Sequence, residues 1–163
     1  MKTNIVVIGL DYEYNLKIGK LIADKINLYF LDVLQYINYS LFSIKDIIEK
    51  FGIEYLERKE NSVVSSCAEF ENTVICIPYM YFFRNNQYER FLNNSNIIYL
   101  EKQIKNIDTK NLEDTLLIDL IAKEDRILDF EKVCNKKITT KNKNEEDIVN
   151  EVINYLRSNK SEY

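Results

Sequence analysis

The sequence of 163 residues contains no histidine, no tryptophan, one proline, three glycines and three cysteines. Without histidine, a Ser-His-Asp triad, a histidine-ligated zinc site and a histidine general base are all excluded. Three glycines leave little room for a loop that wraps a phosphate group, because such loops normally use several. The shortage of glycine therefore argues against an ordinary phosphate-binding loop.

The cysteines Cys67, Cys76 and Cys134 lie far apart and include no C-x-x-C pair. Their number is odd and no signal peptide is evident, so we expect reduced, buried thiols. No uncharged apolar stretch approaches the roughly 18 residues that cross a membrane. We therefore expect a cytoplasmic protein that does not engage a membrane.

The chain has 22 basic and 26 acidic residues, which gives a net charge of -4. It offers no large basic field that could follow a nucleic-acid backbone, so we expect no nucleic-acid partner. With 46% hydrophobic and 12% aromatic residues, it can bury a substantial core and is not disordered. Its length suits a single domain over residues 1–163.

Apolar runs alternate with segments of helical spacing along the chain. The runs predict strands at residues 4–10, 28–31, 73–77, 96–100 and 136–140. Helical spacing and helix caps predict helices at residues 16–26, 43–52, 54–70, 84–94, 103–130 and from 144 onward. The alternation predicts a three-layer α/β/α sandwich around a central, mostly parallel five-stranded sheet.

Several segments together match the pattern of one enzyme family. Residues 9–16 follow a strand and have the length and position of a P-loop, G-x-x-x-x-G-K-[ST]. Residues 30–32 are similar to an F-x-D-x-D motif, and residues 43–55 to an S-I-x-E-I-F-x-x-x-G-E-x-Y-F-R segment. With residues 126–133 and 144–148, the chain resembles shikimate kinases over nearly its whole length. The resemblance implies ATP-dependent phosphorylation assisted by Mg²⁺, and a lid at residues 103–125.

The resemblance fails at the phosphate loop, which begins at Gly9. Tyr14, Asn15 and Leu16 stand where the second glycine, the lysine and the Mg²⁺-binding hydroxyl residue of a P-loop belong. Lys17 follows, one position beyond the expected lysine and hydroxyl pair. The loop also contains two carboxylates, which would repel a polyanion. They belong to Asp11 and Glu13.

The substrate side departs from the pattern as well. Leu34 replaces the second aspartate of the F-x-D-x-D motif, and Glu57 replaces an arginine that should grip the substrate carboxylate, with Arg58 adjacent. Residues 78–80, Pro-Tyr-Met, replace a triple glycine and would fill the pocket. The lid residues 103–122 contain no arginine for the phosphates.

Two residues of the implied site remain. Asp32 is either the carboxylate that binds a metal through water or a cap at the end of its strand. Arg126 either binds the substrate carboxylate or belongs to a solvated helix face.

The aromatic residues near these positions also have two interpretations. One group is either an exposed surface for a partner or core that fills the vacated cleft; it comprises Tyr79, Tyr81, Phe82 and Phe83. Tyr12 and Tyr14 either stack on a ligand or pack across the lost nucleotide site.

The sequence therefore predicts a shikimate-kinase-like protein that has lost phosphoryl transfer and acts as a binding or regulatory module. On this interpretation no cofactor is expected, and the partner is an unknown protein or a second copy. The alternative is an active small-molecule kinase that binds ATP and Mg²⁺ through Lys17, Lys20, Asp32 and Arg126. A third interpretation is a cleft adapted to a non-phosphorylated, cationic ligand.

Overall fold

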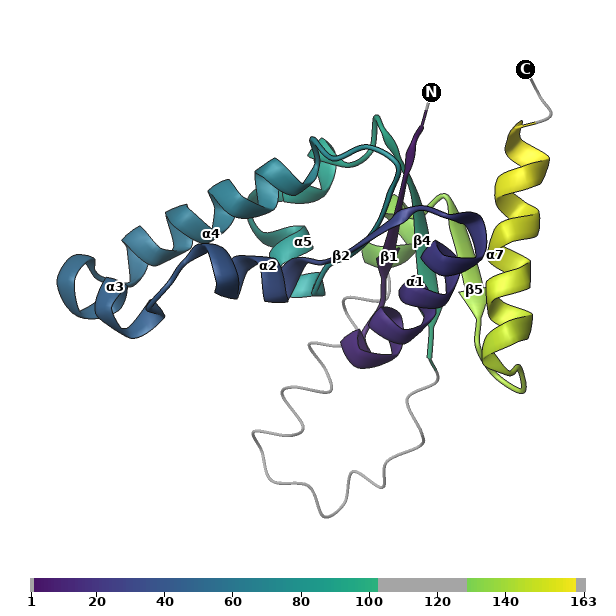
Figure 1. The fold of residues 1–163 in the computed structure, drawn as a ribbon, viewed down its shortest axis with the longest axis horizontal. Coiled ribbons are helices and arrows are strands. Elements are labelled where there is room, and N and C mark those ends of the chain that lie inside the picture. The colour runs from purple at the N-terminus through teal and green to yellow at the C-terminus, as the bar shows by residue number, and fades with distance from the viewer. Residues whose placement is uncertain (1, 103–128, 161–163) are drawn as a thin grey trace, which may run out of the picture.

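The structure, a computed structural model, describes residues 2–102 and 129–160. Its centre is a five-stranded sheet in which every neighbouring pair of strands is parallel, in the order β2-β3-β1-β4-β5 (Figure 1). Val6 lies in register with Ile75 on one side and Ile97 on the other. The strands are β1 (Asn4–Ile8), β2 (Tyr29–Asp32), β3 (Thr73–Cys76), β4 (Ser95–Glu101) and β5 (Lys136–Thr139).

Helices cover both faces of this sheet. They are α1 (Tyr12–Ile26), α2 (Val33–Ser40), α3 (Ile44–Phe51), α4 (Ile53–Cys67), α5 (Tyr79–Phe83) and α7 (Glu145–Lys160). A 3₁₀ segment, η1, spans Arg84–Arg90, and residues 129–133 are helical. The expected three-layer α/β/α sandwich is confirmed, with all of its strands parallel.

Alternate residues of the strands enter two separate cores, because successive side chains of a strand point to opposite faces. Ile5 and Val7 of β1 pack with the apolar faces of α1 and α7. Val6 and Ile8 pack on the other face with residues of α2, α4 and α5. Since both faces are covered, the strands are continuous apolar runs, and this is why the sequence predicted them.

The helices α2, α3 and α4 form an arm that extends away from the sheet, with α3 at its far end (Figure 1). Ser43 caps the start of α3 by accepting a hydrogen bond from the Asp46 N–H at 3.3 Å. Gly52, at φ +84°, separates α3 from α4 as expected, since residues with a side chain rarely adopt this conformation. Unlike α1, α2 and α4, the helix α3 has no fully buried residue.

The expected helix at residues 84–94 is wrong. Asn85 and Asn86 both have left-handed backbone angles, which interrupt a helix, and only the 3₁₀ segment η1 forms there. The helices α2 and α5 were not expected, because each is short and directly follows a strand. The part of the predicted helix at residues 103–130 that precedes residue 129 lies outside the described residues.

The cysteines are free thiols, as expected. Cys67 and Cys76 are buried, and Cys134 is partly exposed. In the part of the chain that the structure describes, no helix is both long and apolar enough to cross a membrane.

Candidate functional site

The candidate site lies where parallel strands end together, because ligands of α/β sheets bind beyond the carboxyl ends of the strands. Here β1, β2, β3 and β4 are neighbours and deliver four turns to one edge of the sheet. These turns begin at Gly9, Asp32, Ile77 and Lys102. We call this region the carboxyl edge.

The turn from β1 to α1 contains only residues 9–11, because α1 already begins at Tyr12. A side chain at Gly9 would place its Cβ 2.7 Å from the Leu100 carbonyl oxygen, so the close approach of β4 requires glycine. The buried Asn15 side chain donates from Nδ2 to the Gly9 carbonyl oxygen at 3.1 Å. The turn is therefore short, and the Asn15 side chain bridges it back to Gly9.

Asp11 occupies a backbone N–H group at the start of α1 that could otherwise bind a ligand. Its carboxylate accepts a hydrogen bond from the Tyr14 N–H at 3.0 Å and so caps the helix. The same carboxylate pairs with the Lys102 ammonium, which also lies 5.3 Å from the centre of the Tyr14 ring. Although desolvation raises the pKa of Asp11, Lys102 and the Tyr14 N–H together hold it below its usual range.

Asp32 ends β2 and caps α2 by accepting a hydrogen bond from the Gln35 N–H at 3.0 Å. Its Oδ1 atom also accepts a hydrogen bond from the Tyr12 hydroxyl at 2.7 Å. The Tyr12 Oη atom lies 3.1 Å from the Cys76 carbonyl oxygen, so this side chain of α1 contacts the ends of two strands, β2 and β3. Desolvation, followed by the bond to Asp32, raises the pKa of Tyr12 far above its usual value.

The turn after β3 is short and leads directly into α5. Tyr79 is partly buried and meets the Phe130 ring edge to face, with 6.2 Å between the ring centres, whereas the Met80 side chain is exposed. Phe82 is fully buried, and Tyr81 and Phe83 pack against the same core cluster. Phe82 is therefore core, and the other three rings are partly buried against it, which favours the interpretation of this group as core over that of an exposed partner surface.

Three further positively charged residues of the predicted site lie on the helices α1 and α4. Lys17 is exposed and pairs with Glu145 of α7 at 2.5 Å between Nζ and Oε1. Arg58 is exposed on α4, with its guanidinium carbon 5.7 Å from the centre of the Tyr55 ring. Lys20 is exposed on α1. Arg126 and the expected lid at residues 103–125 lie outside the described residues.

The structure adds two contacts that sequence reasoning missed. Lys102 was not singled out, because nothing in its own surroundings in the sequence marks it; the pairing of β1 with β4 brings it to Asp11. Tyr12 was expected either to stack on a ligand or to pack across the lost nucleotide site, and its bond to Asp32, which depends on how α1 lies over β2, was not foreseen. Among the described residues, no group of three or more acidic or cysteine side chains could hold a metal ion.

Comparison with known proteins places the fold. The family model for shikimate kinase matches residues 17–157. A shikimate kinase of Alkaliphilus oremlandii is 24% identical over 166 residues, which cover 94% of this chain and 98% of that protein.

Solved structures of shikimate kinases share the same architecture. The enzyme of Aquifex aeolicus superimposes with a TM-score of 0.73 at 21% identity, covering 96% of this chain and 97% of that one. The enzyme of Acinetobacter baumannii, solved in complex with shikimate, gives a TM-score of 0.76 at 20% identity, covering 98% and 96%. The family match and the shared five-stranded parallel sheet agree: this chain belongs to the shikimate kinase family.

Proposed function

We propose that this protein keeps the shikimate kinase scaffold, has lost ATP-dependent phosphorylation of shikimate, and acts as a binding or regulatory module. The observation that carries this proposal is the turn between β1 and α1. A phosphate-binding loop turns its backbone N–H groups inward around the phosphates, and it needs several residues to do so. Here helix α1 begins at Tyr12, and the Asp11 carboxylate already accepts the Tyr14 N–H.

The charges around this turn also oppose phosphate binding. A phosphate group would have to separate Lys102 from Asp11 and would then face the carboxylates of Asp11 and Glu13. At about 6 Å and an effective dielectric constant near 20, each pair of like charges costs roughly 3 kcal/mol, or about a hundredfold in affinity. Lys17, the nearest cation on α1, is paired with Glu145.

The residues that would bind the nucleotide and Mg²⁺ are replaced or engaged in other bonds. Tyr14, Asn15 and Leu16 occupy the P-loop positions that the resemblance assigns to glycine, lysine and a hydroxyl residue. The family match begins only after them, at residue 17. Asp32, the carboxylate that the resemblance places near Mg²⁺, caps α2 and accepts the Tyr12 hydroxyl. Phosphoryl transfer depends on positioning and charge stabilisation by these groups, so the replacement of the three P-loop residues and the engagement of Asp32 in other bonds support loss of the activity.

Isothermal titration of the full chain with Mg-ATP, and separately with shikimate, tests the proposal. We expect no binding at micromolar concentrations of either ligand, whereas the Acinetobacter baumannii enzyme, handled identically, serves as the positive control. A double variant, Asp11→Asn with Glu13→Gln, removes the two repelling charges and should bind inorganic phosphate more tightly than the parent chain. A second double variant, Glu69→Gln with Glu71→Gln, changes two exposed carboxylates that precede β3 and is the control for total charge.

Micromolar binding of Mg-ATP by the parent chain would contradict the proposal. The chain would then be an active small-molecule kinase with an unusual phosphate loop, in which Lys17 and Lys20 contact phosphate. ATP hydrolysis that is lost in a Lys17→Ala variant would identify that case.

A further inference from the structure

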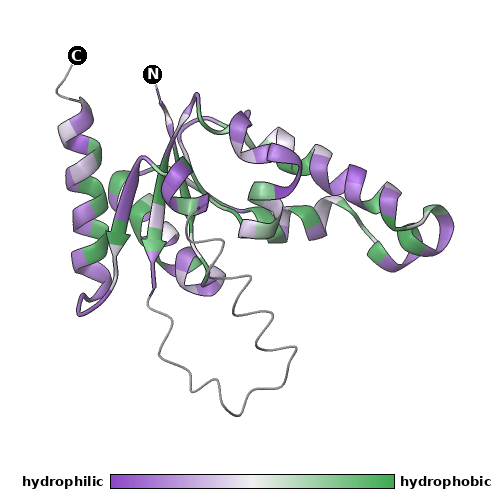
Figure 2. Ribbon diagram, turned by 180° about the vertical axis from the view of Figure 1, so that it is seen from behind, coloured by the Kyte–Doolittle hydropathy of each residue, from purple (hydrophilic) through white to green (hydrophobic). Residues whose placement is uncertain are grey.

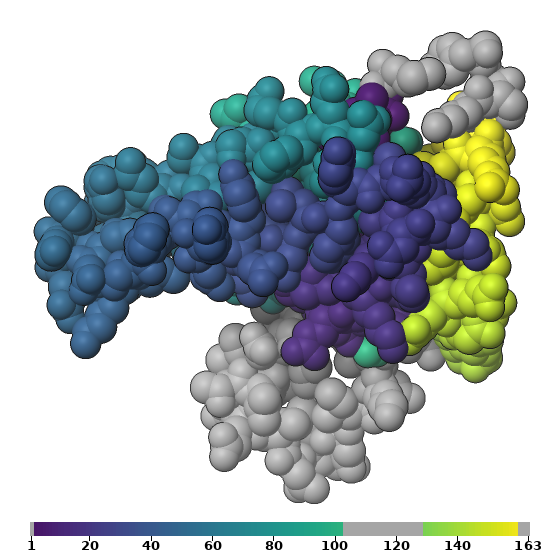
Figure 3. Space-filling model, in the orientation of Figure 1, coloured from purple at the N-terminus to yellow at the C-terminus, as the bar shows by residue number. Residues whose placement is uncertain are grey.

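The far end of the arm exposes an apolar surface that the candidate site does not use. Five residues form it, and we call them the arm-tip patch: Phe42, Ile44, Ile48, Phe51 and Ile53. Phe42 is 98% exposed and Phe51 is 61% exposed, although both are large and apolar. Figure 2 shows hydrophobic residues at this end of the arm, and Figure 3 shows that the arm projects from the body of the molecule.

The patch follows from the sequence of α3. Ile44, Ile48 and Phe51 recur at the spacing of one helix face, which is the pattern that normally faces a core. Nevertheless, no residue of α3 is buried. Ile47 packs against the core, whereas Ile44, Ile48 and Phe51 keep 36–61% of their surface exposed. An amphipathic helix that leaves part of its apolar side in water indicates a surface that another molecule covers.

A hollow lies beside the patch. Its volume is about 450 Å³, and Leu41, Ile47, Phe51 and Tyr55 contribute to its lining. Phe42 stands at its border with almost its whole surface in water. The rest of the lining is polar or charged and comprises Ser40, Ser43, Asp46, Lys50 and Lys59. An exposed aromatic residue next to a hollow with an apolar side is a self-complementary arrangement, since two copies related by a two-fold axis can each insert a ring beside the other's hollow.

We propose that the arm-tip patch is a homodimer interface, in which Phe42 of each copy enters the hollow of the other. The area agrees with this. If a fully exposed large apolar residue presents about 150–250 Å², the fractional exposures of the five residues give a patch of roughly 430–730 Å². A standard interface buries about 800 Å² per partner, of which about 56–65% is non-polar. The patch therefore equals the apolar part of one such interface.

The charges on α3 favour a second copy over a strongly charged partner. The helix has two lysines and two carboxylates: Lys45, Asp46, Glu49 and Lys50. Its net charge is therefore zero, so it neither attracts a polyanion nor repels an identical helix. Lys45 and Glu49 are already 3.9 Å apart within the helix. The inference concerns a surface on the arm and holds whether or not the carboxyl edge binds nucleotide.

Sedimentation velocity of the full chain, from about 1 µM to about 1 mM, tests the proposal. We expect a monomer–dimer equilibrium in the parent chain. Phe42→Glu should weaken the dimer about 30-fold or more, as expected for a central aromatic anchor, and Ile48→Glu at least about tenfold. Tyr29→Glu is the matched control, because Tyr29 is an exposed aromatic residue at the start of β2, and it should leave the equilibrium unchanged.

Hydrogen exchange of the parent chain provides a measurement that does not depend on the folding of any variant. Amides of residues 40–53 should exchange more slowly at dimer-forming concentrations than at low concentration. A parent chain that stays monomeric over the whole range overturns the proposal, as does a dimer that both arm variants leave intact. Patch-dependent binding of the monomer to phosphatidylcholine vesicles would also overturn it, by assigning the patch to a membrane.

Discussion

The bond between Tyr12 and Asp32 offers a direct test of how the carboxyl edge is closed. In a Tyr12→Phe variant the ring remains, but Asp32 loses the hydroxyl that donates to it at 2.7 Å. The Asp32 carboxylate keeps its bond from the Gln35 N–H, so α2 remains capped. The change therefore removes the bond to Asp32 together with two longer contacts of the same hydroxyl, which lies 3.1 Å from the Cys76 carbonyl oxygen and accepts the Leu34 N–H at 3.4 Å.

The magnitude at pH 7 follows from the type of bond. A hydrogen bond to a charged acceptor contributes about 1.5–3 kcal/mol to the free energy of unfolding. Because Tyr12 and Asp32 are both partly exposed, we expect a contribution near or just below the lower end of this range, about 1–2 kcal/mol. Tyr12→Phe should be less stable than the parent chain by that amount.

The difference between the two proteins should shrink in alkali. The folded-state pKa of Tyr12 is raised, first by desolvation and then by Asp32, so its contribution is complete below the unfolded pKa of about 10. Above that pH the unfolded parent chain releases the Tyr12 proton and the folded chain does not. By pH 11 this release costs the parent chain about 1.4 kcal/mol, a loss that phenylalanine cannot show.

Urea unfolding of both proteins at a series of pH values from 7 to 11 measures this difference. Tyr29→Phe is the control, since Tyr29 is exposed on β2 and forms no part of the carboxyl edge. We expect the gap between the parent chain and Tyr12→Phe to close toward zero near pH 11. Equal stability at pH 7, or a gap that stays constant up to pH 11, would refute the reasoning.

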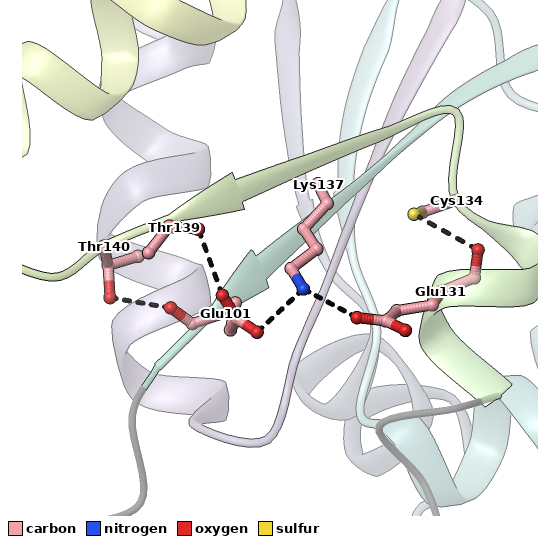
Figure 4. A network of polar contacts seen from close by, with 6 residues as sticks. All are labelled: Glu101, Glu131, Cys134, Lys137, Thr139 and Thr140. Atoms are coloured by element: carbon pink, nitrogen blue, oxygen red, sulfur yellow. Dashed lines mark hydrogen bonds and ion pairs between the residues drawn. The ribbon is translucent and has the colours of Figure 1, made fainter.

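Three further results are expected. Gly19→Ala should lower the free energy of unfolding by about 1–2 kcal/mol, because the new Cβ would lie 2.4 Å from the Cys76 Sγ atom. The helix-propensity gain of about 1 kcal/mol offsets only part of that strain. Adding Cys76→Ala should restore stability in the same urea assay. Lys137→Met should cost about 0.5–1 kcal/mol at pH 7, because the Lys137 ammonium lies 2.9 Å from Glu101 and 2.6 Å from Glu131 (Figure 4). The Lys137 hydrogen bond holds the pKa of Glu101 below its usual value, so this cost should fade as the pH drops below about 4.5 and Glu101 is protonated; a cost that is unchanged at pH 3 would contradict the assignment. Alkylation of the native protein by iodoacetamide, followed by mass spectrometry, should modify Cys134 first, because Cys67 is buried and burial raises its pKa to about 12.

The proposed loss of activity concerns the carboxyl edge, whereas the proposed dimer concerns the far end of the arm, so their tests are independent. The carboxyl edge is closed by internal contacts among Asp11, Tyr12 and Asn15. The arm, which carries the arm-tip patch, extends away from that edge (Figure 1). Dimerisation without nucleotide binding would support a module that acts through its arm. Nucleotide binding without dimerisation would contradict both proposals.

The parallel sheet could be read from the sequence because the strands are covered on both faces. β1, β3 and β4 are continuous apolar runs for that reason, and each ends at a recognisable residue or turn. Gly19 of α1 lies against Cys76 of β3, where helix and sheet pack closely. The family resemblance depended on these same scaffold positions, which local patterns preserve.

Tertiary structure alone decided how the carboxyl edge is arranged. Lys102 and Asp11 are 91 residues apart and meet because β4 pairs with β1, a fact that no local pattern contains. From the sequence, the aromatic residues after β3 could equally have faced solvent. In the fold Phe82 is buried and the other rings pack partly against the same core. At the arm, the fold exposes residues that the sequence pattern would place in a core. The spacing of Ile44, Ile48 and Phe51 predicts an amphipathic helix, and only the fold shows that these side chains stay partly in water. Local chemistry determines which segments form, whereas the pairing of distant segments determines what each side chain contacts.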